Sequence, residues 1–122
     1  MNVEPQETLA QAERLADSLR LLATEYQAVV RSTQKTDPGG ATARRSLDRR
    51  FQKLKAREEI DALRESGYPD AAQNLDDLFR AAAMVFNLVA VSIGVDEAEV
   101  LDIDVNSPHV AAVKALKQAS GT

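Results

Sequence analysis

Apolar residues recur along the first part of the chain with the period of an α-helix. Between Gln6 and Arg31 they stand alternately three and four residues apart, at Leu9, Ala12, Ala16, Leu19, Ala23, Tyr26 and Val30. This spacing places them on one side of an amphipathic helix. The stripe is wider than the seam of a two-stranded coiled coil, because it is flanked by Leu15, Leu22 and Val29. We therefore predict a helix that faces two neighbours in a bundle.

The segment Ser32–Thr42 has no apolar period and contains the run Asp37-Pro38-Gly39-Gly40. Proline and glycine adopt turn dihedral angles at little cost, so this run predicts a connecting loop. The loop is longer than a tight helix hairpin needs, which makes it a candidate for contact with a partner.

A second helix is predicted from Ala43 to Glu65, with Thr42 as its N-cap and Ser66-Gly67 as its stop. Its apolar pattern changes halfway. At 100° per residue, one face carries Leu47, Phe51 and Leu54, and the opposite face carries Ala56, Ile60 and Leu63. Either this helix bends near Lys55–Glu58, or its two halves pack against different neighbours.

A third helix is predicted to start at a capping box formed by Asp70 and Gln73 and to end at Gly94. From Ala81 to Val95 the chain is apolar on nearly every side, which is typical of a central helix. This stretch is shorter than the roughly 20 residues that a membrane-spanning helix needs.

The end of the chain predicts a connector and a last helix. Residues 101–106 alternate between apolar and polar types, but a single strand would have no partner, so we expect a short helix or an extended connector. Ser107 as N-cap and Pro108 in the first turn predict a helix that continues through Val110, Val113 and Leu116.

These elements predict an all-α fold, an antiparallel bundle of three long helices plus a short C-terminal helix. A length of 122 residues is typical of one domain, so we expect a single helical-bundle domain over residues 1–122. Acidic residues precede any basic residue near the N-terminus, and no apolar signal segment follows them. We expect a cytoplasmic protein that does not enter a membrane.

The composition excludes several kinds of chemistry. The chain has no cysteine and one histidine, which excludes disulfides, thiolate metal sites, cysteine nucleophiles and metal sites built from several histidines. The segment Asp102–Ser107 begins like a calcium loop, but Ser107 and Val113 occupy the positions that require glycine and glutamate. No nucleotide-binding or hydrolase motif is present. We predict no catalytic residue, no metal and no cofactor, and consider an enzyme the least favoured class.

Charge is distributed unevenly along the chain. Residues 42–57 hold seven basic side chains and one acidic, a net charge of +6, whereas the remaining residues hold 8 basic and 18 acidic, a net charge of −10. In one helix from Ala43 to Glu65, cations would lie near the electropositive end and carboxylates near the electronegative end, which is unfavourable. Something should compensate these cations. The candidate binding residues are Arg44, Arg45, Arg49, Arg50, Lys53 and Arg57.

Three kinds of negatively charged group could neutralise the basic residues of the segment 42–57. Acidic groups of the fold or of an oligomer could face the basic stretch, for example those at Glu13, Asp17 and Glu25 or in the segment Asp96–Asp104. An acidic protein partner is the second possibility, and a phosphate backbone is the third. Exposed aromatic residues that could stack on bases are not interleaved with the cations, and the whole chain is acidic, which disfavours nucleic acid.

The function that these patterns favour is a small helical protein–protein interaction module, an adaptor, accessory or assembly subunit that self-associates. The alternative is an accessory protein that binds a polyanion or nucleic acid through residues 42–57. A helix-turn-helix over Glu58–Phe79 is disfavoured, because the turns that would meet DNA hold Asp70, Asp76 and Asp77.

Overall fold

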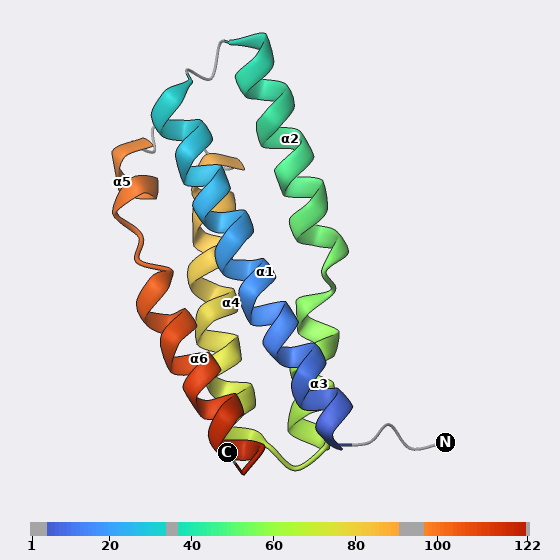
Figure 1. Ribbon diagram of the computed structural model, residues 1–122. Coiled ribbons are helices and arrows are strands. Elements are labelled where there is room, and N and C mark those ends of the chain that lie inside the picture. Colours follow the sequence, from blue (N-terminus) through green and yellow to red (C-terminus); the bar gives the residue numbers. More distant parts are fainter. Residues whose placement is uncertain (1–4, 34–36, 91–96, 122) are drawn as a thin grey trace.

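The computed structural model describes residues 5–33, 37–90 and 97–121, which form helices joined by short connections and no strand (Figure 1). The predicted all-α class is confirmed. The helices are α1 (Pro5–Ser32), α2 (Pro38–Lys53), α3 (Ala56–Glu65), α4 (Pro69–Ala90), α5 (Glu97–Asp102) and α6 (Asn106–Ala119). The predicted stop of the third helix at Gly94 lies outside the described residues.

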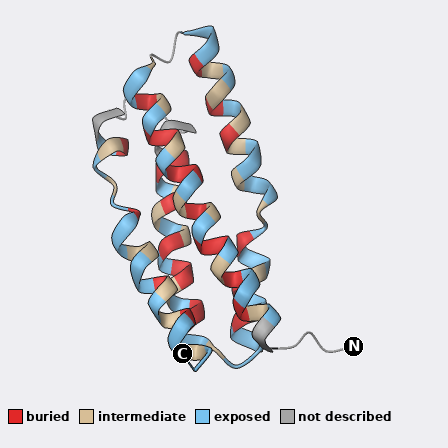
Figure 2. Ribbon diagram, viewed as in Figure 1, coloured by how far each residue is buried: buried red, intermediate tan, exposed pale blue. Residues whose placement is uncertain are grey.

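Helices α1 and α4 together form the centre of the bundle, so the predicted central position of the third helix is shared with the first. Helix α1 contacts α2, α3, α4, α5 and α6, and α4 contacts α3, α5 and α6 in addition. Figure 1 shows α1 and α4 running in one direction while α2, α3 and α6 run in the other. The buried residues gather on the faces that the helices turn towards one another (Figure 2). The predicted apolar stripe of α1 is confirmed, since all seven of its residues from Leu9 to Val30 are buried.

The predicted second helix is interrupted, as its apolar pattern indicated. Helix α2 ends at Lys53, and Lys55 adopts a left-handed conformation (φ 51°, ψ 45°) before α3 begins at Ala56. The interruption turns Leu47 and Ile60, which a continuous helix would place on opposite faces, into the same core.

The interruption also overturns our inference that the charges oppose the helix dipole. Arg50 and Lys53 lie in the last turn of α2, where cations are favoured. Glu58 and Glu59 lie in the first turn of α3, where carboxylates are favoured. These four charges are therefore favourable in two short helices, whereas they would be unfavourable in one long helix.

Two predictions about the start of α2 are wrong. The helix begins at Pro38 rather than Ala43, because proline at the first helical position has the required φ and lacks only an N–H that would have no partner in the helix. Thr42 is therefore inside α2, and its hydroxyl donates to the Pro38 carbonyl (2.9 Å) instead of capping the helix. Residues 34–36 of the predicted loop lie outside the described residues.

The junction between α3 and α4 follows the predicted stop but not the predicted capping box. Gly67 has φ 96°, and its N–H and that of Tyr68 donate to the carbonyls of Arg64 and Leu63, which closes α3 in a Schellman motif. Helix α4 begins at Pro69, and the side-chain amide of Gln73 donates to Asp77 (3.0 Å).

A buried glutamine fixes α5 against α1. The side-chain amide of Gln27 donates to the carbonyls of Val100 (2.8 Å) and Ile103 (2.9 Å), which lie at the end of α5. The Val100 carbonyl also accepts from the Ile103 N–H (3.4 Å), so Gln27 adds a second hydrogen bond there and supplies a partner to the Ile103 carbonyl beyond the helix end. The chain then runs on through residues 103–105 as the expected connector.

Helix α6 starts at Asn106, so Ser107 is not its N-cap as predicted. The carboxylate of Asp104 accepts hydrogen bonds from the backbone N–H groups of Asn106 (2.9 Å) and Ser107 (3.1 Å). The helix runs through Val110, Val113 and Leu116 as predicted; Leu116 is buried, Val113 is partly buried, and Val110 is 64% exposed on the outer side of α6.

We expect Lys55→Gly to stabilise the protein by about 0.5–1 kcal/mol, because glycine adopts the left-handed conformation without the clash of a Cβ atom. Urea unfolding monitored by circular dichroism measures the difference. Lys55→Val is the opposite control, since a β-branched residue is strained at positive φ and should destabilise. If Lys55→Val were more stable than Lys55→Gly, the left-handed conformation at this position would be wrong.

We expect the contribution of Asp104 to the stability of the folded protein to depend on pH. Hydrogen bonds from the Ser107 side chain, from the Ser107 backbone and from the Asn106 backbone lower the pKa of this carboxyl group. The stabilisation is then complete above the unfolded-state pKa of about 3.9 and is lost as the pH falls through the lower folded-state pKa. Asp104→Ala should therefore lower the thermal midpoint at pH 7 and have little effect at about pH 2. Asp102→Ala, at an exposed carboxylate nearby, is the control.

Candidate functional site

The candidate binding residues fall into two groups in the structure. Arg44, Arg50 and Arg57 have partners within the chain, and Arg45, Arg49 and Lys53 face away from the bundle. The separation follows from helix geometry, because residues that lie four apart share a face of α2. The other face of this helix holds the residues that pack inward, namely Gly40, Arg44, Leu47 and Phe51.

Arg44 joins α2 to the end of α1. Its side chain is buried, and Nη2 donates to the Thr33 carbonyl (3.2 Å) directly after α1. Cations are favoured at helix C-termini, where carbonyl groups lack partners in the helix. This contact gives Arg44 a structural function.

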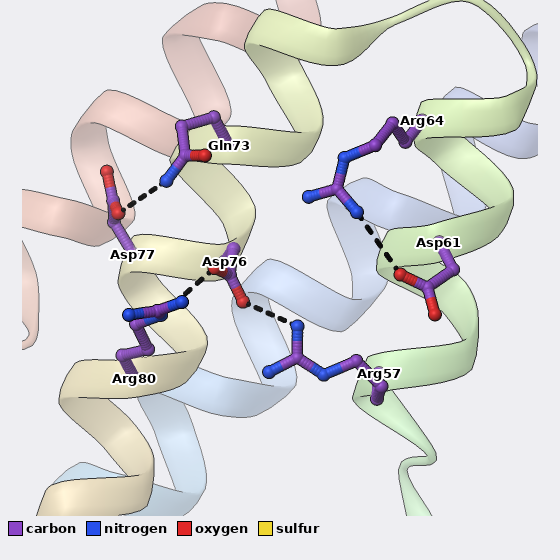
Figure 3. Close-up of polar contacts among 7 residues, drawn as sticks. All are labelled: Arg57, Asp61, Arg64, Gln73, Asp76, Asp77 and Arg80. Carbon is purple, nitrogen blue, oxygen red and sulfur yellow. Dashed lines mark hydrogen bonds and ion pairs between the residues drawn. The ribbon is translucent and has the colours of Figure 1, made fainter.

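Arg57 belongs to a cluster around a buried carboxylate on α4. Asp76 is 4% exposed, and its two oxygens accept from Arg57 Nη1 and Arg80 Nε, each at 3.0 Å. Figure 3 shows Asp76 between the two guanidinium groups, whereas the neighbouring Asp77 points towards Gln73. Arg57 also lies over the ring of Phe79, 5.2 Å from its centroid, in a cation–π contact.

The acids that compensate the basic stretch are only partly those that the sequence indicated. Glu25 of α1 pairs with Arg50 at 3.6 Å, as one alternative proposed, and both side chains are well exposed. Asp17 instead contacts His109 of α6 (2.8 Å).

The sequence analysis did not identify Asp76 as a partner of the basic residues. Its signal in the sequence is its place four residues after Ala72 and three before Phe79, on the apolar face of α4.

The outward face of α2 carries Arg45, Arg49 and Lys53, which we call the basic stripe. These residues follow one another at every fourth position, about 6 Å apart along the helix axis. All three are exposed. Within the described parts of the chain, no carboxylate pairs with any of them, and the one polar contact is between Arg45 and the Thr42 hydroxyl at 3.5 Å.

The aromatic residues near the basic stripe are directed inward. Phe51 stacks on Phe86 and Phe79 with centroid distances of 4.5 and 5.9 Å, and Tyr26 lies against Phe86 at 4.5 Å. These contacts attach both α2 and α1 to α4. They also leave the outer side of α2 without an aromatic ring on which a base could stack.

The single histidine, which could take part in catalysis or metal binding, contacts a carboxylate of another helix. His109 is held against Asp17 at the junction of α6 and α1. No group of three or more acidic or histidine side chains that could hold a metal ion occurs among the residues that the structure describes. None of the described helices combines the length and the apolarity that crossing a bilayer requires.

Comparisons with models of protein families, with curated proteins and with solved structures find no match to this chain.

We expect Asp76→Asn to destabilise the protein by about 1.5–3 kcal/mol, because it removes the buried negative charge between two guanidinium groups and replaces one accepting oxygen with an NH2 group that cannot accept. Asp77→Asn is the matched control on the adjacent exposed residue and should change stability by less than about 0.5 kcal/mol. Urea unfolding at pH 7 compares the two variants. Equal effects would show that the cluster around Asp76 does not hold α3 on α4.

Proposed function

We propose that the protein is a small helical protein–protein interaction module, a single-domain adaptor, accessory or assembly subunit. Its binding surface is the basic stripe of α2, and its partner is the acidic surface of a protein. The observation that carries this proposal is the division of the cations. Arg50 and Arg57 pair with carboxylates of the chain, whereas the three stripe residues have no such pair within the described residues.

The stripe costs stability in the free protein. Arg45, Arg49 and Lys53 are neighbours at i, i+4, and such like-charged pairs destabilise a helix by about 0.2–0.5 kcal/mol each. A ligand with negative charges at the same spacing would remove this repulsion and gain ion pairs. The electrostatic complementarity would also accelerate the encounter and select the partner.

An acidic protein surface fits this face better than a phosphate backbone. The outward side continues from α2 to α3, where Glu58, Asp61 and Glu65 are exposed. A nucleic acid that followed the stripe past Lys53 would meet these carboxylates. A folded partner can place its acids opposite the stripe alone and its cations opposite α3.

The binding surface can be mapped with a photo-crosslinking amino acid in place of Gln52, which is exposed beside the stripe, or of Gln118 on α6 as the matched control. In extracts of the source cells we expect protein crosslinks from position 52 that disappear at high salt. The combined substitution of Arg45, Arg49 and Lys53 by alanine should abolish them. Equal crosslinking from both positions, or crosslinks that the triple variant keeps, would refute the proposed surface.

A short DNA duplex tests the alternative. At about 50 mM salt, where phosphate contacts are strong, we expect no retardation of the duplex by the protein. Retardation that weakens steeply with salt and is lost in the triple alanine variant would assign the stripe to a nucleic acid instead.

A further inference from the structure

We propose that the partner of the basic stripe is a second copy of this chain, bound antiparallel along α2 and α3. This inference deepens the proposed function and rests on it. The exposed carboxylates of α3, at Glu58, Asp61 and Glu65, are called the acidic stripe here. The two stripes lie on the exposed sides of consecutive helices, so a partner that follows the α2–α3 segment would meet both kinds of charge.

The acidic stripe occupies the side of α3 that faces away from the core. Ala56, Ile60 and Leu63 fill the inward side of this helix. Glu59 is not part of the stripe, because it lines a depression with Leu54 and residues of α1, and burial there raises the pKa of its carboxyl group while Arg14 opposes the rise. Asp61 contacts Arg64 at 3.2 Å, but this pair is exposed and such pairs contribute little, so Asp61 remains able to bind a partner.

The two stripes are symmetric about the helix break. Arg49 and Asp61 lie equally far from Lys55 along the chain, and so do Arg45 and Glu65. The residue as far beyond Lys55 as Lys53 lies before it is Arg57, a cation that pairs with Asp76, and Glu58 follows one position later. Successive residues are about 6 Å apart along the axis in the basic stripe and about 4.5 and 6 Å apart in the acidic stripe.

A two-fold axis through the break would bring these counterparts together. It would place Arg49 of each chain opposite Asp61 of the other, and Arg45 opposite Glu65, so every contact would occur twice. The two copies of Lys55 would lie near the axis, where this long exposed side chain can extend its charge into solvent. A parallel arrangement would instead bring the two basic stripes together and is unfavourable.

The contact is expected to be weak and sensitive to salt. Helices α2 and α3 together are about 40 Å long and about 10 Å wide, so they can cover about 400 Å² of each chain. Stable interfaces cover about 800 Å² per partner. The dimer should therefore form at high protein concentration and low ionic strength, and screening should dissociate it.

Sedimentation equilibrium of the purified protein up to about 1 mM, at low and at high salt, tests for the dimer. We expect a dimer at low salt and a monomer at high salt. Arg49→Glu and Asp61→Lys should each weaken association at least about tenfold, because each creates two like-charged contacts in a symmetric dimer. Circular dichroism of every variant confirms that it is folded.

Two rescue experiments test the antiparallel register. The double variant R49E/D61K should dimerise like the wild type, because each contact regains opposite charges. An equimolar mixture of the Arg49→Glu chain and the Asp61→Lys chain should form heterodimers for the same reason. The control pair K114E/D77K has the same net charge and exchanges charges on exposed positions of α6 and α4, and it should leave association unchanged.

Absence of concentration-dependent association in the wild type at low salt would overturn the inference. Loss of association in both single variants without rescue in either experiment would overturn the antiparallel register. If the protein is monomeric but position 52 still crosslinks to other proteins, the proposed function stands and the self-association is wrong. If the dimer forms and no other crosslink appears, self-association is the entire interaction.

Discussion

The left-handed conformation of Lys55 is the constraint on which the rest of the structure depends. It divides a segment of helical sequence into α2 and α3 and rotates their apolar faces into one core, so that Leu47 and Ile60 are both buried. It also places Arg50 and Lys53 at the end of one helix and Glu58 and Glu59 at the start of the next. A strained residue is tolerated here because both the packing and the helix dipoles favour the break.

The cations of α2 and α3 divide into those that hold the fold together and those that are exposed without a carboxylate partner among the described residues. Arg44 satisfies a carbonyl at the end of α1, and Arg57 shares the buried carboxylate of Asp76 with Arg80. These contacts hold the two halves of the α2–α3 segment against α1 and α4. The residues left on the outside, Arg45, Arg49 and Lys53, are the ones that the fold does not use. The basic surface is therefore narrower than the run of basic residues in the sequence.

The proposed interaction depends on the order of charge along this outer side. The basic stripe lies on α2 and the acidic stripe lies on α3, before and after the break at Lys55, and α3 also exposes Arg57 and Arg64. The same order makes the surface complementary to a reversed copy of itself. The placement of charges at the helix ends and the proposed contact between chains therefore depend on the same break in the helix.

The sequence by itself determined the helical class, the buried stripe of α1, the stop at Gly67 and the change of apolar face near Lys55, because these depend on local periodicity and on backbone conformation. It did not determine that Thr42 lies inside α2 or that Asp104 caps α6, since helix ends are set by small local energies that compete, and it did not determine that Val110 is exposed, since this depends on which side of α6 packs on the bundle. Only the tertiary structure decided which cations have partners. Asp76 and Arg57 lie on different helices, and whether their charges meet depends on how α3 packs on α4, which no local pattern specifies.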